Sequence, residues 1–214
     1  MDAEKELLIQ GLSVLDIVAP PETVEAFLFY LSELKKWNKA YNLTAITAAR
    51  EIIIKHFLDS LLYLKALPPS VRTVCDVGSG AGFPGVPLSL ASPDSSVTLI
   101  EPSRKRCAFL RHITHRLALE RIAVIEARVD ELNGPLFDAV VTRATFSVAD
   151  FVKQAGHLVD ENGCLVMNKG GKAFQEISAL PAGYAYESIP ATLPFAGQER
   201  VLLRLTRTYH EYMG

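Results

Sequence analysis

The sequence contains few cysteines and no long apolar run. Cys75, Cys107 and Cys164 are odd in number and lie far apart among apolar neighbours, which argues against a disulfide framework and against a zinc site. No segment approaches the ~18 consecutive apolar residues that a membrane span requires. The acidic, helically periodic start also lacks the features of a signal peptide. These absences predict a cytoplasmic protein that binds no metal and contacts no membrane.

An excess of basic residues is also absent. The 22 Lys and Arg residues are balanced by 24 Asp and Glu residues, a formal net charge of −2 over 214 residues. A nucleic-acid partner would therefore have to be bound by a local basic patch. Apolar residues make up 49% of the chain and charged residues 21%, which excludes a disordered chain and provides material for a core. The length is that of one compact domain with a small appendage, and we expect a monomer.

Helical spacing dominates the first third of the chain. Apolar residues recur at this spacing over residues 7–15, a second helix is expected from Pro20 to about Trp37, and a third helix is expected over residues 52–64. A pair of prolines then marks a boundary. We expect a helical N-terminal extension packed on a catalytic domain, at residues 1–67 and 68–214.

Beyond this boundary, short apolar runs alternate with longer helical stretches. The alternation indicates a parallel sheet with crossover helices, hence a doubly wound, Rossmann-like α/β fold. Two later runs are expected to form a terminal hairpin. The expected strands lie at residues 71–77, 96–101, 121–127, 137–142 and 163–168, and those of the hairpin at 184–190 and 199–207.

The most informative stretch is DVGSGAGFPG at residues 76–85, between the first strand and its helix. Its glycines allow the backbone to approach a ligand closely, and the free amides at the start of the helix favour negative charge. Gly80, Gly82 and Gly85 fit the GxGxxG pattern of dinucleotide sites. Gly78, Gly80 and Gly82 fit instead the GxGxG pattern usual for S-adenosylmethionine. The spacing alone therefore leaves both cofactors open.

Two acidic residues near this loop favour an adenosine-containing ligand. Asp76 precedes the first glycine, where its carboxylate can face the ammonium and sulfonium-bearing arm of S-adenosylmethionine and would repel a pyrophosphate. The alternative role for Asp76 is to cap a helix. Glu101 ends the second strand and is placed to accept hydrogen bonds from both ribose hydroxyls of either cofactor. Asp76 tilts the choice toward the methyl donor.

Further candidates follow from the fold, because ligands bind at the carboxyl ends of the strands. Phe83 either packs against the cofactor or belongs to the core. Val129 and Asp130 follow the third strand, where a backbone amide and a carboxylate can read the adenine edge; a solvated loop acid is the alternative. Arg143 ends the fourth strand beside the expected acceptor, and can hold the donor's carboxylate or an acceptor phosphate.

The sequence lacks the usual devices for methylating an exocyclic amine or a pyrimidine carbon. The fourth strand continues into TRATFSV instead of a DPPY or NPPY loop, and none of the three cysteines fits as a nucleophile on an exposed loop. A ring nitrogen with its own lone pair needs neither device, because catalysis then reduces to alignment and exclusion of water. No general base is therefore expected.

Basic residues gather around the expected pocket despite the balanced net charge. One patch is a helical face after Glu101, a second surrounds Trp37 and Tyr41, and a third ends the fifth strand. Such patches fit the binding of a phosphate backbone, and solvated helix surfaces are the alternative. The candidate RNA-binding residues are Lys36, Lys39, Arg104, Lys105, Arg111, Arg116, Lys169 and Lys172.

Four stretches together resemble one family. WNKAYNLTAI (37–46), HFLDSLL (56–62), DVGSGAGFPGVPLSL (76–90) and SRKRCAFLR (103–111) closely resemble the bacterial small-subunit ribosomal RNA guanine-N7 methyltransferases, also called glucose-inhibited division protein B. The likeness covers nearly the whole chain, and WNKxxNLT with HxLDS is more specific than the glycine loop. The resemblance implies a class I methyltransferase fold, S-adenosylmethionine as donor, and N7 of one guanine of 16S rRNA, the family's guanine-527 site, as acceptor.

The resemblance also bears on single residues. It implies donor-binding roles for Gly78, Phe83, Val129, Asp130 and Arg143, and Phe83 departs from the aliphatic residue frequent in the family. Its N-terminal signature is expected to dock the helical extension onto the sheet through hydrogen bonds, and comprises Asn42, His56, Asp59 and Ser60.

We expect Arg143 and Lys169 to provide acceptor-side electrostatics, holding a phosphate or the O6 edge while N7 stays free. The acceptor is either naked 16S rRNA or the 30S subunit. Two other classes of function stay open: an NAD(P)-dependent oxidoreductase that uses the same glycine loop, and a noncatalytic RNA-binding module. Asp76 and the N-terminal signature argue against both.

Overall fold

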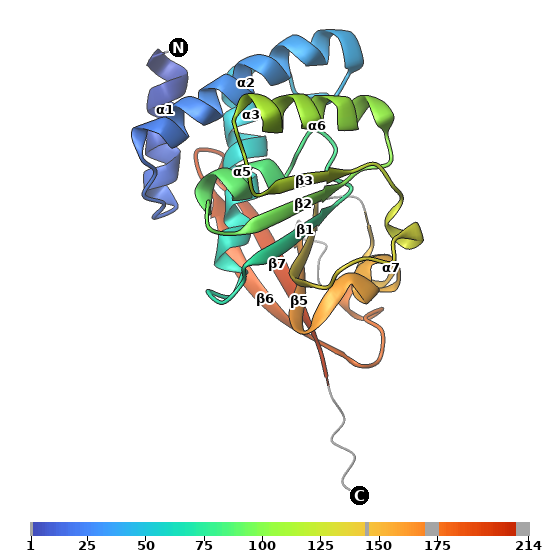
Figure 1. Cartoon of the computed structure of the whole chain (residues 1–214). Helices are drawn as coiled ribbons and strands as arrows, with labels where there is room; N and C mark the ends of the chain where they lie inside the picture. Colours follow the sequence, from blue (N-terminus) through green and yellow to red (C-terminus); the bar gives the residue numbers. More distant parts are fainter. Residues whose placement is uncertain (1, 144–145, 170–175, 209–214) are drawn as a thin grey trace, which may run out of the picture.

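The computed structural model describes residues 2–143, 146–169 and 176–208. Its centre is one sheet, whose strands are β1 (Thr73–Val77), β2 (Ser96–Ile100), β3 (Ile122–Ile125), β4 (Phe137–Arg143), β5 (Val159–Lys169), β6 (Tyr184–Leu193) and β7 (Gln198–Arg207). The seven strands lie in the order β3-β2-β1-β4-β5-β7-β6 (Figure 1). β1 to β5 run parallel, and β7 runs antiparallel to both β5 and β6.

The doubly wound parallel sheet and the terminal hairpin predicted from the sequence are confirmed. The central strands β1 and β4 read as continuous apolar runs because helices cover both faces of the sheet, and Val74, Cys75, Val140 and Val141 are buried. β5 begins earlier than predicted, at Val159. Val159 pairs with Phe137 of β4, and a register shift precedes the next pair, Cys164 with Ala139. The polar residues between Val159 and Cys164 give no apolar strand pattern, so the earlier start was not predicted.

The helical segments before β1 are α1 (Asp2–Val14), α2 (Pro21–Tyr41), α3 (Ala49–Ile52), the π-helix η1 (Ile53–Leu58), α4 (Asp59–Leu61) and the 3-10 helix η2 (Leu62–Lys65). α2 begins after Pro20, since proline suits the first helical position. It continues past the predicted end at Trp37 and stops where Asn42 adopts a left-handed φ of 50° and its N–H donates to the Asn38 carbonyl. The predicted third helix is not regular, because it changes from α to π and ends as 3-10.

The remaining helices are α5 (Gly85–Ala91), α6 (Arg104–Arg116), η3 (Val129–Glu131), α7 (Val148–Ala155) and η4 (Gly156–Leu158). The N-terminal helices, α5 and α6 lie on one face of the sheet and α7 lies on the other (Figure 1). Phe27 and Phe57 of the N-terminal helices share one apolar cluster with Val74 and Val141 of the sheet. A division of the chain after residue 67 stays a prediction. Within the described ranges, no helix is long and apolar enough to cross a membrane.

Candidate active site

The glycine loop connects β1 to α5 at the carboxyl edge of the sheet. Gly80 has a φ of +60°, and a Cβ atom there would meet only the Gly78 carbonyl at 3.9 Å, so a ligand has room to approach the backbone. Gly82 has a φ of +99°, and a Cβ atom there would lie 2.6 Å from the Tyr30 hydroxyl. The loop therefore needs glycine for conformation at both positions and for close packing at the second.

A cavity of about 250 Å³ lies beside this loop, at the carboxyl ends of β1, β2 and β3. Its lining brings together four of the predicted donor-binding residues, Gly78, Glu101, Val129 and Asp130. In open α/β sheets this is the edge at which ligands bind. Their shared position supports the assignment of this cavity to the donor.

Glu101 is the best-placed of these residues. Its carboxyl group is buried, with Oε2 accepting a hydrogen bond from the Gly80 N–H at 2.8 Å and Oε1 accepting one from the Ser103 N–H at 2.9 Å. Arg106 lies 3.7 Å from Oε1. The carboxylate therefore attaches the glycine loop to the end of β2, and each oxygen retains further acceptor capacity for a ligand.

Val129 and Asp130 line the same cavity and belong to η3. Val129 is buried, whereas Asp130 is exposed and pairs with Arg128 at 3.2 Å. The hydrogen bond from Arg128 holds the pKa of Asp130 below its ordinary value. Asp130 is thus ionised near neutral pH and can accept hydrogen bonds from an adenine amino group.

Asp76 lies behind the loop instead of among the residues that line the cavity. Its side chain is completely buried, and Oδ2 accepts a hydrogen bond from the Gly85 N–H at 2.9 Å. Its other oxygen, Oδ1, has no hydrogen-bond partner within the described part of the chain. Burial raises the pKa of Asp76 to about 7, against the lowering effect of the Gly85 hydrogen bond. Contact between Asp76 and the donor stays a prediction.

Phe83 also lies outside the cavity lining. It is buried within an aromatic cluster, where its ring stacks on His56 at a centroid distance of 4.5 Å and on Tyr30 at 5.5 Å. The guanidinium carbon of Arg143 lies 4.9 Å from the centre of the Phe83 ring. Phe83 thus joins the glycine loop to the N-terminal helices, and its contact with the donor stays a prediction.

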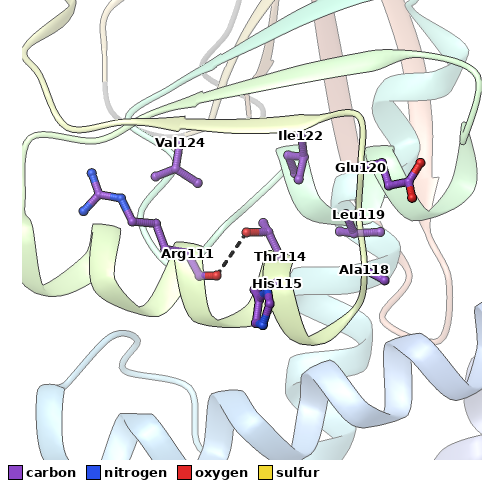
Figure 2. A pocket seen from close by; sticks show the side chains of 8 residues that line it. All are labelled: Arg111, Thr114, His115, Ala118, Leu119, Glu120, Ile122 and Val124. Atoms are coloured by element: carbon purple, nitrogen blue, oxygen red, sulfur yellow. Dashed lines mark hydrogen bonds between the residues drawn. The ribbon is translucent and has the colours of Figure 1, made fainter.

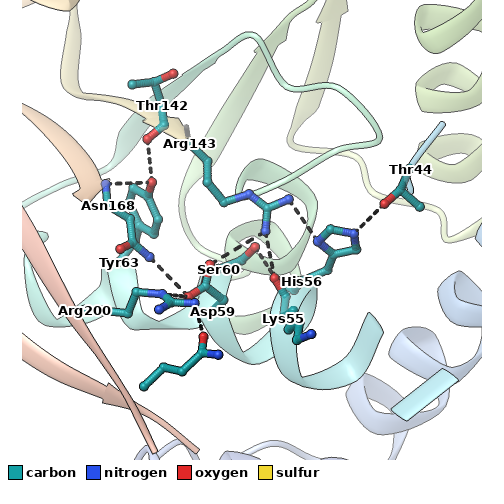
Figure 3. Close-up of polar contacts among 11 residues, drawn as sticks. Thr44, Lys55, His56, Asp59, Ser60, Tyr63, Thr142, Arg143, Asn168 and Arg200 are labelled. Atoms are coloured by element: carbon teal, nitrogen blue, oxygen red, sulfur yellow. Dashed lines mark hydrogen bonds and ion pairs between the residues drawn. The ribbon is translucent and has the colours of Figure 1, made fainter. Parts of the chain in front are cut away.

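Arg143 is enclosed by the N-terminal signature (Figure 3). Its guanidinium donates to the Lys55 carbonyl at 3.2 Å and to His56 Nδ1 at 3.1 Å, and lies 3.9 Å from Asp59 Oδ2. The π-helix η1 supplies both hydrogen-bond acceptors, consistent with the frequent occurrence of π turns at functional sites. Sequence periodicity predicts only a regular helix here and so misses this arrangement.

The contacts of His56 fix its tautomer and charge. Arginine can only donate hydrogen bonds, so Nδ1 of His56 accepts from Arg143 and the ring proton lies on Nε2, which donates to the Thr44 hydroxyl at 2.8 Å. Burial and the nearby Arg143 charge lower the pKa of His56 to about 3. His56 is therefore neutral near physiological pH. Thr44, the last residue of WNKxxNLT, is a member of the site that the sequence-based reasoning did not single out.

Asp59 sits between two arginines (Figure 3). In addition to Arg143, it accepts hydrogen bonds from Arg200 Nε at 2.8 Å and from Asn168 Nδ2 at 3.3 Å. Arg200 was not predicted, because the hairpin prediction did not fix the register that brings it beside Asp59. The Ser60 hydroxyl donates to the His56 carbonyl at 2.6 Å. Two signature residues, His56 and Asp59, thus contact residues at the ends of β4 and β5. Ser60 bonds within its own helical segment, and Asn42 ends α2.

Lys169 ends β5, next to the end of β4. Its ammonium group donates to the Phe146 carbonyl at 2.6 Å and pairs with Glu176 at 2.9 Å. An acceptor group that approached Lys169 would therefore compete with Glu176. Lys172, the other candidate in this region, lies outside the described residues.

The predicted basic patches of α2 and α6 lie on two helices that pack side by side, and their exposed surface is called the α2 and α6 face. Glu33 of α2 pairs with His112 of α6. Trp37, one turn later on α2, contacts Phe109, which lies one turn earlier on α6, so the two helices run antiparallel. Arg111 pairs with Glu126 at 3.1 Å and Lys36 with Glu33 at 3.5 Å. The exposed basic residues with no ion-pair partner among the described residues include Lys39, Arg104 and Lys105.

A second cavity lies on the α6 side of the edge strand β3 (Figure 2). Its volume is about 400 Å³, and Arg111, His115, Ile122 and Val124 contribute to its lining. It contains none of the predicted donor-binding residues and lies away from the glycine loop. Within the described part of the chain, no group of three or more His, Cys, Asp or Glu side chains could hold a metal ion.

Comparison with known proteins matches this geometry to a family. A family model described as rRNA small subunit methyltransferase G, or GidB, matches residues 23–203. The chain belongs to this family. It is 39% identical over 196 residues to ribosomal RNA small subunit methyltransferase G of Cronobacter sakazakii, with 90% of this chain and 94% of that protein covered. The protein of the same name from Azoarcus sp. is 38% identical over 202 residues, with coverage of 94% and 95%.

Solved structures support the fold of this methyltransferase G family member. The cofactor-bound structure of Rv0187 from MTB has a TM-score of 0.62 at 20% identity, covering 90% of this chain and all (100%) of that one. TYW2 from M. jannaschii in complex with AdoMet has a TM-score of 0.54 at 15% identity, covering 69% and 75%. At such identities the likeness shows the fold alone, and it confirms the predicted class I methyltransferase fold.

Proposed function

We propose that this protein transfers a methyl group from S-adenosylmethionine to N7 of guanine 527 in 16S rRNA. Membership of the methyltransferase G family over residues 23–203 carries the proposal. The chain is an S-adenosylmethionine-dependent methyltransferase of the small-subunit rRNA, which decides against the oxidoreductase and the noncatalytic RNA-binding module. We place the reaction in the cytoplasm and expect the protein to act as a monomer on naked rRNA or on the 30S subunit.

The residues around the cavity fit the methyl donor. When bound, the donor supplies a methyl group on a positively charged sulfur. Glu101 offers two carboxylate oxygens for ribose hydroxyls, and Val129 and Asp130 can receive an adenine edge. Gly80 leaves open space for a ligand to approach. Asp76 has one buried oxygen without a hydrogen-bond partner among the described residues, and it is the candidate counter-charge for the cationic arm.

The acceptor side requires positioning without proton transfer. N7 of guanine has a lone pair and carries no proton, so the work of the protein is alignment and exclusion of water. Arg143 and Lys169 end the adjacent strands β4 and β5 and can hold the O6 edge or a phosphate. His56, with its pKa lowered to about 3 by burial and by Arg143, stays neutral. It is therefore assigned to holding Arg143 and not to acid-base chemistry.

The α2 and α6 face is our candidate for binding the RNA backbone. Lys39, Arg104 and Lys105 project from it, and the start of α6 adjoins the donor cavity through Arg106. Exposed basic side chains bind phosphates chiefly by releasing counterions, so affinity should fall steeply with salt. Arg111 and Arg116 extend the same face along α6.

A labelling experiment tests the proposed function. The protein is incubated with labelled S-adenosylmethionine and either deproteinised 16S rRNA or 30S subunits from a strain that lacks the modification. Borohydride and aniline treatment then cuts at 7-methylguanine, because methylation activates the ring. Cleavage at guanine 527 is expected, and the more active substrate identifies the natural acceptor. Absence of label in both substrates would refute the proposal, and RNA that already carries the modification is the negative control.

A further inference from the structure

A buried tyrosine of α2 holds the glycine loop. The Tyr30 hydroxyl donates to the Ala81 carbonyl at 2.5 Å, and its ring stacks on Phe57 at 5.2 Å and on Phe83 at 5.5 Å. Tyr30 is fully buried, so water does not compete for this carbonyl. Since a Cβ atom at Gly82 would lie 2.6 Å from the hydroxyl, the loop is packed directly against it.

A second buried tyrosine holds the strand ends on the acceptor side (Figure 3). The Tyr63 hydroxyl, in η2, donates to the Thr142 carbonyl at 2.5 Å and accepts from the Asn168 N–H at 3.1 Å. Thr142 directly precedes Arg143 in β4, and Asn168 directly precedes Lys169 in β5. One hydroxyl therefore connects the two strands at the residues that lead into the proposed acceptor contacts.

We propose that Tyr30 and Tyr63 are positioning residues, Tyr30 for the donor loop and Tyr63 for the ends of β4 and β5 that carry Arg143 and Lys169. The inference rests on the proposed function and adds to it a role for the N-terminal helices. These helices then contribute one hydroxyl to each half of the site. The signature residues act at a third place, around the side chain of Arg143.

Both hydroxyl groups act as hydrogen-bond donors to the backbone. Burial raises the pKa of Tyr30 and that of Tyr63 well above the usual value of 10, so both groups remain protonated. Replacement by phenylalanine keeps each ring and removes only the oxygen. A buried carbonyl then loses its partner, a loss that generally costs more than the net value of the hydrogen bond. The carbonyl can regain a partner only by movement of the backbone.

Hydrogen exchange provides a readout that needs neither donor nor RNA. The Gly82 and Phe83 amides donate to the Ser79 carbonyl at 2.8 and 2.9 Å, within the turn that Tyr30 holds. Tyr30→Phe should raise exchange of these amides about tenfold and leave the Asn168 amide unchanged, and Tyr63→Phe should do the reverse. Phe27→Leu weakens the packing of α2 on Phe57, removes no hydroxyl, and controls for general destabilisation. Equal exchange changes in all three variants would overturn the proposal.

Calorimetry and kinetics separate the two roles in the full chain. Tyr30→Phe should weaken S-adenosylmethionine binding about tenfold, with Tyr63→Phe and Phe27→Leu within twofold of the parent protein. With saturating donor, Tyr63→Phe should raise KM for 16S rRNA about tenfold and Tyr30→Phe less than twofold. Donor affinity unchanged in Tyr30→Phe, or an identical kinetic pattern in both tyrosine variants, would overturn the inference. A parent protein that binds donor but methylates no RNA would refute the proposed function alone, because calorimetry and exchange still test the tyrosines.

Discussion

Replacement of Asp76 by asparagine should stabilise the protein and at the same time impair donor binding. The carboxyl group is completely buried, and within the described ranges only one of its oxygens has a hydrogen-bond partner. Burial raises its pKa from 3.8 to about 7. Between these two pH values the folded protein holds a proton that the unfolded chain releases. The contribution of Asp76 protonation to the free energy of unfolding is therefore fully present below pH 3.8 and is lost as the pH rises through about 7.

The shift sets the size of the effect. At 1.36 kcal/mol per pKa unit, a rise of the Asp76 pKa from 3.8 to about 7 corresponds to about 4 kcal/mol of stability, which is lost by the time the pH has risen to about 7. Asparagine retains an oxygen for the Gly85 N–H and carries no charge. Its stability advantage over the parent protein should grow by roughly 2 to 3 kcal/mol between pH 5 and pH 8.

Urea unfolding followed by circular dichroism at pH 5, 6, 7 and 8 measures this difference. Asp138→Asn is the matched control: burial raises the pKa of Asp138, but hydrogen bonds from Arg72 and Thr73 outweigh it and the net shift is downward. That variant should lose stability at neutral pH. Parallel pH profiles for Asp76→Asn and the parent protein would refute the reasoning about Asp76. In the parent protein the affinity for S-adenosylmethionine should increase as the pH rises through about 7, because Asp76 then becomes ionised. In Asp76→Asn the affinity should stay constant over this range.

The other predictions concern the donor, the RNA and His56, which contacts Arg143. Glu101→Gln should weaken S-adenosylmethionine binding by about 1.5 to 3 kcal/mol, measured by calorimetry, and an unchanged affinity would show that Glu101 is misassigned. The double variant Arg104→Glu, Arg111→Glu should weaken RNA binding and reduce the dependence of affinity on salt concentration, whereas Lys153→Glu on α7 should change neither. The same salt dependence in the double variant and the parent would exclude the α2 and α6 face as the RNA-binding surface. His56 itself lowers stability by about 3 kcal/mol as the pH falls from 6.5 to 4, so the stability of His56→Asn relative to the parent should rise by that amount over the same range. A constant difference between the two proteins in urea unfolding would contradict a neutral His56.

The fold was predictable because its signals are local. Apolar runs of strand length, alternating with helical stretches, indicate the parallel sheet, and the confirmed β6 and β7 hairpin follows from two runs separated by a turn. The cavity that we assign to the donor was equally predictable, because Gly78 and Glu101 directly follow strands and Val129 lies in the segment after β3. Strand ends converge in any parallel sheet, so chain position alone places these residues together.

The proposed acceptor side was harder to predict, because its contacts join residues that are far apart in the sequence. Arg200 meets Asp59 only through the register of the hairpin against β5, and Tyr63 reaches Thr142 only through the packing of η2 on the sheet. The π-helix at His56 has no periodic signal of its own, since its apolar residues also fit an α-helix. Long-range register and local helix type are decided by tertiary packing, which single-residue patterns do not encode.

His56 and Asp76 influence stability with opposite signs, although both are buried groups of one site. Burial lowers the pKa of His56 from 6.5 to about 3, so the contribution of His56 to stability rises with pH up to 6.5. Burial raises the pKa of Asp76 from 3.8 to about 7, so the contribution of Asp76 falls with pH over an overlapping range. Between pH 3.8 and 6.5 each contributes a slope of about 1.36 kcal/mol per unit, and the two slopes cancel. In this window Asp76→Asn should reveal a rising profile, His56→Asn a falling one, and the double variant should restore the flat profile. Identical profiles in the single variants would show that these groups do not titrate as their burial requires.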